Sequence, residues 1–144
     1  MTMSDLQELK DWAAKRHRHW CHRLQTIGEV LEMEFTPPKC EFSTRTSKSA
    51  GVYFPKERKC RYYLAYIILA GKKYDETIAH EIAHSFVYQT KIRAACHGDL
   101  FRFVVHRMCG FGNHKCTHDL STHKAKKLSK LLRLMEKMNG NGKV

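Results

Sequence analysis

The five residues His80-Glu81-Ile82-Ala83-His84 carry the side chains in this sequence that are best suited to metal chemistry. Histidines at positions i and i+4 lie on one face of a helix, so both imidazoles can reach a single metal ion. A glutamate directly after the first histidine can contact a metal-bound water and act as its general base. The pattern predicts zinc ligands at His80 and His84 and an acid/base at Glu81; the alternative is two surface histidines beside a glutamate.

A third ligand is expected, because catalytic zinc usually takes three protein ligands and keeps one position for water. Residues 82–135 contain no glutamate, and their only acids are Asp99 and Asp119, which argues against a downstream glutamate ligand. His97 fits best, since it follows a loop, precedes a predicted helix and is followed by a glycine that allows a sharp turn. His106 is the alternative from the residues alone.

Charge is the second informative feature of the sequence. Among 144 residues, 26 Lys and Arg oppose 14 Asp and Glu, which gives a formal net charge of +12. Such an excess in one small domain attracts polyanions, and we expect DNA to be the partner. The candidate DNA-contacting residues lie in two basic segments and are Lys15, Arg16, Arg18, Arg23, Lys124, Lys126, Lys127 and Lys130. The alternative is that both segments are solvated helix faces.

The composition also bears on the cellular setting. There is no apolar run long enough to span a bilayer and no recognisable export signal, so we expect an intracellular protein without membrane contact. The six cysteines are then more consistent with reduced thiols or metal ligands than with disulfides. We expect a monomer with one modest core.

Hydrophobic periodicity predicts an α+β fold that places the motif on a helix. A long amphipathic helix runs from Ser4 to near Met33, and the proline pair that follows stops it. The remaining expected elements are strands at Lys39–Thr44, Gly51–Phe54 and Arg61–Ile68, a metal-binding helix from Tyr74 or Asp75 to Thr90, a helix at Leu100–Met108 capped by Asp99, and a basic C-terminal helix.

The paired motifs resemble the SprT-like metallopeptidase family. The resemblance rests on His80-Glu81-x-x-His84, twelve intervening residues and then His97-Gly98-x-x-Phe101-Arg102, and on the upstream segments Pro38–Phe42, Ala50–Tyr53 and Tyr74–Ala79. It covers about residues 5–112. It implies a zincin-like fold, zinc held by His80, His84 and His97, and Glu81 as catalytic acid/base. Because the family includes proteases that degrade DNA-crosslinked proteins, it also implies single-stranded or structured DNA as activator.

The C-terminal part departs from the family pattern. Many members carry a four-cysteine zinc ribbon after this domain, whereas this sequence has no paired Cys-x-x-Cys motif. It offers Cys109, Cys116, His118 and His123 instead, with His114 nearby, and these could hold a second, structural zinc; the alternative is ordinary thiols and solvated histidines. We therefore predict a peptidase domain at residues 1–114 and a basic tail or helix at 115–144, which can pack on the same domain.

The function predicted from the sequence is zinc-dependent endopeptidase activity on DNA-bound or DNA-crosslinked proteins. The substrate is expected to lie extended along the edge of the small sheet. One alternative is a DNA- or partner-binding module with a structural or vestigial zinc. The other is a zinc hydrolase that acts on a different amide or on small peptides.

Overall fold

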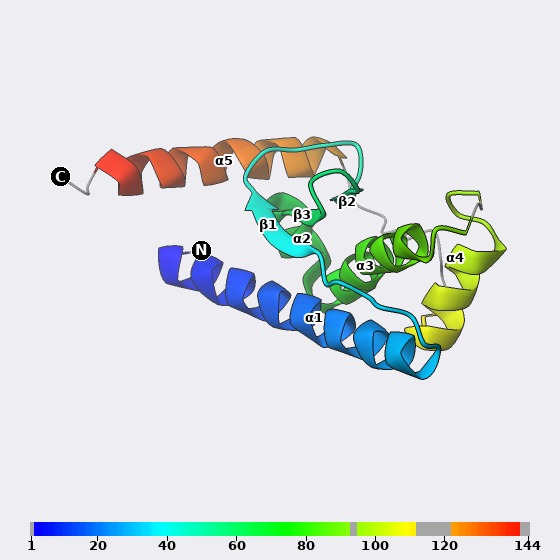
Figure 1. The fold of residues 1–144 in the computed structure, drawn as a ribbon. Helices are drawn as coiled ribbons and strands as arrows, with labels where there is room; N and C mark the ends of the chain where they lie inside the picture. Colours follow the sequence, from blue (N-terminus) through cyan, green and yellow to red (C-terminus); the bar gives the residue numbers. More distant parts are fainter. Residues whose placement is uncertain (1, 93–94, 112–121, 142–144) are drawn as a thin grey trace.

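The computed structural model describes residues 2–92, 95–111 and 122–141. It is an α+β structure with a long N-terminal helix, a small three-stranded sheet and several further helices (Figure 1). In chain order the elements are α1 (Met3–Val30), β1 (Lys39–Ser43), β2 (Gly51–Phe54), β3 (Lys59–Tyr63), α2 (Leu64–Ala70), the 3-10 turn η1 (Gly71–Lys73), α3 (Tyr74–Thr90), α4 (Asp99–Phe103), the π-helical turn η2 (Val104–Met108) and α5 (Thr122–Asn141).

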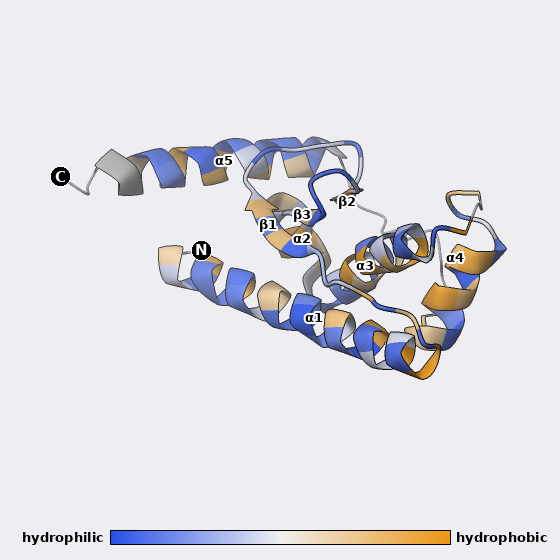
Figure 2. Cartoon of the chain, viewed as in Figure 1, coloured by the Kyte–Doolittle hydropathy of each residue, from blue (hydrophilic) through white to orange (hydrophobic). Residues whose placement is uncertain are grey.

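Helix α1 is the long amphipathic helix that the sequence predicts. Its cap is Thr2 rather than Ser4: Thr2 Oγ1 accepts from the Asp5 backbone N–H at 3.1 Å, and Asp5 Oδ2 accepts from the Thr2 backbone N–H at 2.8 Å. This reciprocal pair satisfies two backbone donors that a helix start leaves open. One stripe of α1 is buried, and hydropathy alternates along the helix (Figure 2).

The sheet has the order β1-β3-β2. Strand β1 runs parallel to β3 with Cys40 opposite Cys60, and β2 runs antiparallel to β3 with Val52 opposite Arg61. Strands β1 and β2 are therefore the two edges of the sheet, and β2 is the edge that packs beside α3. This order leaves the outer side of β2 without a strand partner among the described residues.

The prediction of a third strand at Arg61–Ile68 is wrong in its second half. Strand β3 ends at Tyr63, and the apolar run Leu64–Ala70 forms helix α2, of which the first four residues are buried. When a short run is apolar at every position, its sequence shows no hydrophobic periodicity, so a strand and a helix cannot be told apart. The tertiary surroundings decide between the two.

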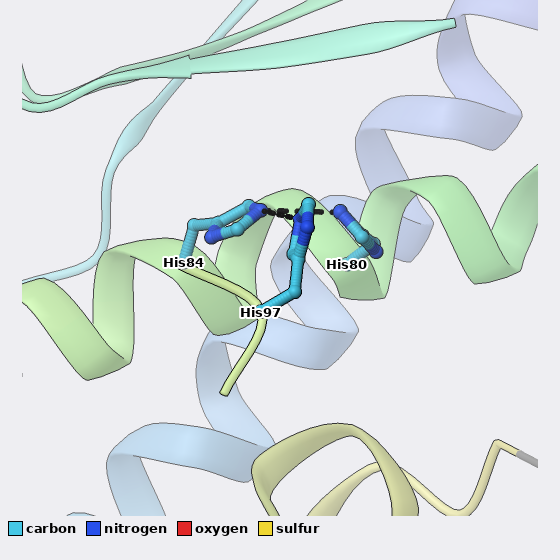
Figure 3. A group of neighbouring side chains, drawn as sticks. All are labelled: His80, His84 and His97. Atoms are coloured by element: carbon cyan, nitrogen blue, oxygen red, sulfur yellow. Dashed lines mark hydrogen bonds between the residues drawn. The ribbon is translucent and has the colours of Figure 1, made fainter. Parts of the chain in front are cut away.

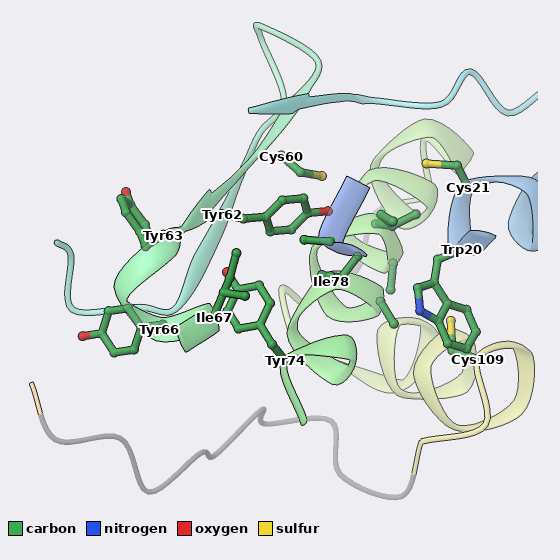
Figure 4. Close-up of a cluster of buried hydrophobic side chains, with 14 of the residues drawn as sticks. Trp20, Cys21, Cys60, Tyr62, Tyr63, Tyr66, Ile67, Tyr74, Ile78 and Cys109 are labelled. Atoms are coloured by element: carbon green, nitrogen blue, oxygen red, sulfur yellow. The ribbon is translucent and has the colours of Figure 1, made fainter. Parts of the chain in front are cut away.

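The core lies between the sheet, α1 and α3 (Figure 4). Tyr62 and Tyr74 are fully buried, and the Tyr74 hydroxyl donates to the Ala50 carbonyl at 2.5 Å. His17 of α1 is also buried, and its ring nitrogens contact the Tyr62 hydroxyl at 2.7 Å and the Pro38 carbonyl at 2.8 Å. Burial lowers the pKa of His17, so its neutral form links α1 to the sheet.

The helix predicted at Leu100–Met108 is present in two pieces, α4 and the π-helical turn η2. Its N-cap is Gly98 rather than Asp99. Phe101, Val104 and Val105 face the core as the periodicity predicts. Helix α4 follows directly on the segment that carries His97, so its packing fixes where that segment lies.

Helix α5 packs against the same core. Ala125 and Leu132 are buried, and the Ser129 hydroxyl donates to the Thr44 carbonyl. The Thr44 hydroxyl in turn donates to Glu136 Oε2 at 3.1 Å. These contacts join α5 to the end of β1 and to α2. The domain boundary between residues 114 and 115 stays a prediction.

An ion pair fixes the start of α3 against α1. Arg16 donates to both carboxylate oxygens of Asp75 at 2.8 and 2.9 Å, and Trp20 Nε1 donates to Asp75 Oδ1 at 2.9 Å. Two-pronged arginine–carboxylate bonds are geometrically specific and stronger than neutral hydrogen bonds. This contact sets the position of the helix that carries the histidine motif.

Replacement of Asp75 by alanine is expected to destabilise the fold by about 2 kcal/mol, because it leaves two partly buried donor groups without their acceptor. Urea unfolding followed by circular dichroism measures the change. The exposed Glu8 of α1 is the matched acidic control, and Glu8→Ala should shift stability by less than about 0.5 kcal/mol. Equal effects of the two substitutions would contradict this role of Asp75.

Candidate metal centre

Helix α3 positions three of the predicted site residues. His80 and Glu81 are buried and His84 is half-buried, each near the middle of the helix. The first turn of α3 carries Asp75 and Glu76, which suit the positive end of a helix. Because the helix continues for six residues past His84, both histidines lie on a fully hydrogen-bonded and therefore rigid segment.

The loop between α3 and α4 brings His97 to this pair (Figure 3). His84 Nε2 lies 3.1 Å from His80 Nε2 and 3.2 Å from His97 Nε2. A tetrahedral zinc with bonds of about 2.0–2.1 Å separates neighbouring ligand atoms by about 3.3–3.4 Å, so this spacing fits such an ion. The three side chains could hold one metal ion, and among the described residues they form the one such group.

An aromatic side chain packs against the three histidines. The Phe101 ring of α4 is fully buried and lies 4.3 Å from the His84 ring, 4.8 Å from His80 and 5.0 Å from His97, between ring centroids. Arg102 Nε also donates to the His97 carbonyl at 3.2 Å. Phe101 therefore packs against all three imidazoles, and Arg102 holds the backbone of His97.

Electrostatics favour the neutral, metal-binding form of His84. The pKa of His84 is lowered to about 3, first by burial and then by the neighbouring His80 and His97. A neutral imidazole is the form that coordinates a metal. Protonation of His84 is thus unfavourable, and the three clustered ring nitrogens could share one metal ion.

Glu81 is buried beside strand β2. Burial raises the pKa of its carboxyl group to about 8, and a hydrogen bond from the Tyr53 backbone N–H opposes the rise. A nearby divalent cation favours the ionised carboxylate, so metal binding and ionisation of Glu81 support one another. The arrangement is that of a carboxyl group able to accept a proton and to give it back near neutral pH.

Strand β2 approaches Glu81 closely because of a glycine. A Cβ added to Gly51 would lie 3.3 Å from Glu81 Cγ and 3.1 Å from Thr77 Cγ2. Only a residue without a side chain lets the strand pass this near to the helix. The close approach places the Tyr53 N–H within reach of Glu81.

A cleft opens above the three histidines. Its volume is about 1100 Å³, and β2, the second half of α3 and the loop after α3 line it. His80, Glu81, His84 and His97 all contribute to the lining. The cleft is therefore large enough for an extended segment of polypeptide and passes directly over the candidate metal ligands.

The structure separates His97 from the alternative, His106. His106 lies exposed on η2 and is not part of the three-histidine group. Of the predicted second metal set, Cys109 is a buried free thiol with a pKa raised to about 12 by burial, and His123 is exposed on α5. Cys116 and His118, with the neighbouring His114, lie outside the described residues.

The predicted basic segments differ in their exposure. Lys15, Arg18 and Arg23 are exposed on α1, although Arg23 Nε also donates to the Met108 carbonyl at 2.6 Å. Arg16 is half-buried and engaged by Asp75. On α5 all four predicted cations are exposed: Lys124, Lys126, Lys127 and Lys130. In Figure 1 the sheet and α2 lie between α1 and α5. Helix α5 is thus the more available basic face.

Sequence reasoning placed the substrate along the edge of the small sheet but did not identify the contact between β2 and Glu81. It placed Tyr53 and Gly51 within the expected strand Gly51–Phe54 and gave neither residue a separate role. The signal that could have identified this close approach is the glycine itself, because glycine inside a strand pattern often marks a neighbouring backbone or helix. The site accordingly consists of a helix, a loop and a sheet edge.

The arrangement defines an α+β protein with a candidate three-histidine metal centre on a helix that packs under a sheet edge. A model of the SprT-like family matches residues 17–122, and the chain belongs to that family. The family is associated with metallopeptidase-type domains. Comparison with curated proteins and with solved structures finds no significant match. Within the described part of the chain, no helix is both long and apolar enough to cross a membrane.

Proposed function

We propose that the protein is a zinc-dependent endopeptidase with a zincin-like active site, formed by His80, His84, His97 and Glu81. The observation that carries this proposal is that three imidazole nitrogens converge beside a buried carboxyl group. His84 Nε2 lies 3.1 Å from His80 Nε2 and 3.2 Å from His97 Nε2, and the carboxyl group is that of Glu81. Membership of the SprT-like family supports the same function.

The residues of the chain divide the reaction between them. Zinc held by the three histidines would supply a Lewis acid that polarises the scissile carbonyl and activates water. Glu81 takes a proton from the attacking water and delivers it to the leaving amine. The Tyr53 N–H holds the Glu81 carboxylate in place, and the buried Phe101 ring packs against all three imidazoles.

The edge of the sheet supplies a place for the substrate backbone. Strand β2 has β3 on one side, and its other side borders the cleft. An extended peptide can add to such an edge through main-chain hydrogen bonds, which carry little sequence preference. This geometry supports cleavage of polypeptide chains over hydrolysis of a small amide, which would need a closed pocket.

DNA is the proposed activator, and protein bound or crosslinked to DNA is the proposed substrate. The net charge of +12 and the exposed lysines of α5 support binding to a polyanion. DNA held by this helix would concentrate enzyme and protein substrate on one strand. An enzyme with little sequence preference would then cleave chiefly the proteins that are bound to the same DNA.

The test of the DNA link is cleavage of a DNA-bound protein with and without single-stranded DNA over a salt series. The affinity for single-stranded DNA is measured over the same salt series. Replacing Lys126, Lys127 and Lys130 by alanine should make the slope of log DNA affinity against log salt concentration shallower by about 2, because three phosphate contacts are lost. The triple variant at the exposed Lys56, Lys72 and Lys73 removes the same charge and should keep the wild-type slope.

Cleavage that DNA does not stimulate, with equal salt slopes for both triple variants, would contradict the DNA link and leave the peptidase standing. DNA binding without any cleavage would favour the alternative, a binding module with a structural metal.

A further inference from the structure

The cleft continues past His84 toward the C-terminal end of α3, where its lining becomes aromatic and aliphatic. Four residues form this part, which we call the aromatic wall: Tyr53 of β2, Val87 and Tyr88 of α3, and Ile92 of the following loop. The Tyr88 and Ile92 side chains are 58% and 59% exposed. Large apolar side chains left open inside a concave site favour an apolar ligand group.

A chain of hydrogen bonds holds Tyr53, and Tyr53 in turn contacts Tyr88. The Tyr53 and Tyr88 rings meet edge to face, with centroids 6.3 Å apart. The Tyr53 hydroxyl bonds to the buried Ser85, which accepts from Gln89 Nε2 at 3.0 Å. Gln89 also bonds both the N–H and the carbonyl of Thr36, at 2.8 Å each. The Tyr53 side of the wall is therefore held in place before a ligand binds, which lowers the cost of binding.

The position of the wall relates it to the scissile bond. Tyr88 follows His84 by four residues, so the two lie about 6 Å apart along the helix axis. An extended peptide advances about 3.3 Å per residue. A substrate side chain that reaches the wall therefore belongs to a residue within about two positions of the bond at the metal site.

We propose that the aromatic wall is a specificity subsite for a large aromatic or aliphatic substrate side chain. The proposal rests on the peptidase activity proposed above and adds its side-chain preference. Polar groups also line the cleft, among them Glu34, Arg58 and Lys91, but the aromatic wall supplies large apolar side chains within one turn of His84. Backbone pairing with β2 leaves sequence open, and the wall supplies the selection at one position.

A mixture of randomised peptides tests the preference, with the new termini sequenced by mass spectrometry. Phe, Tyr, Leu and Met should be enriched about 10- to 100-fold over Ser and Gly at one position near the cut. Tyr88→Ala should reduce this enrichment several-fold, and Tyr88→Phe should retain it. Phe103, an equally exposed aromatic residue on α4 outside the cleft, is the control, and Phe103→Ala should keep the wild-type profile.

A binding measurement separates failure of the subsite from failure of the peptidase. The Glu81→Gln protein is titrated with a labelled peptide that contains one Phe and with its Ser counterpart. Tighter binding of the Phe peptide, reduced by Tyr88→Ala, supports the subsite even where the wild type cleaves nothing. Equal binding of the two peptides, or cleavage without enrichment at any position, would overturn the subsite, and in the second case the peptidase would stand.

Discussion

Replacing Glu81 by glutamine is expected to lower kcat for protein cleavage by a factor of about 10²–10⁴, the usual contribution of a general acid–base group. The amide keeps the size of the side chain but cannot take up the proton of the attacking water. Because Glu81 is not one of the three converging ligands, the variant should retain the wild-type metal content. Steady-state cleavage assays and metal analysis of the same preparations measure both quantities.

Glu34 provides the matched control for this substitution. It is an exposed acid that lines the same cleft, away from the three histidines. Glu34→Gln should leave kcat within a small factor of wild type. If the Glu81 and Glu34 variants were equally active, Glu81 would not be the acid/base of this site.

Loss of the loop ligand should have the second large effect. His97→Ala removes one of three nitrogens that lie within 4.8 Å of one another. We expect zinc affinity to fall by more than about 100-fold, which exceeds the cost of losing a group that only supports a ligand. Activity should fall with it and recover in part at high zinc concentration. Competition with a chromogenic chelator measures the affinity.

The control is the histidine that the sequence alone could not exclude. His106 is exposed on η2, outside the three-histidine group. His106→Ala should bind zinc as the wild type does. Unchanged zinc affinity in His97→Ala, with loss in His106→Ala, would contradict the proposed ligand set.

The long elements were predictable because each has a strong local signal. The 28-residue α1 has a periodic apolar stripe, and α3 has the spacing His80-Glu81-x-x-His84 in its middle. Both need little information beyond their own residues. The run Leu64–Ala70 failed as a strand because its residues are apolar on every face, so burial alone does not select a period.

The site was predictable where sequence spacing dictates geometry and not where tertiary contacts do. Residues four apart on a helix must share a face, whereas the choice between His97 and His106 depends on how α4 packs. The contact between Gly51 and Glu81 joins residues 30 positions apart and has no sequence signature beyond a glycine. Arg16 was predicted to contact DNA, and only its bond to Asp75 shows that it also serves the fold.

The most direct test of the central claim is isotope incorporation during cleavage. Zinc-loaded wild-type and Glu81→Gln proteins are incubated in ¹⁸O-water with a DNA-bound protein substrate and single-stranded DNA, and the new carboxyl termini are examined by mass spectrometry. We predict ¹⁸O-labelled C-termini with the wild type and a much smaller amount of labelled C-termini with the variant. Equal inertness of the two proteins on every substrate, with zinc bound to both, would contradict the assignment of this site as a peptidase.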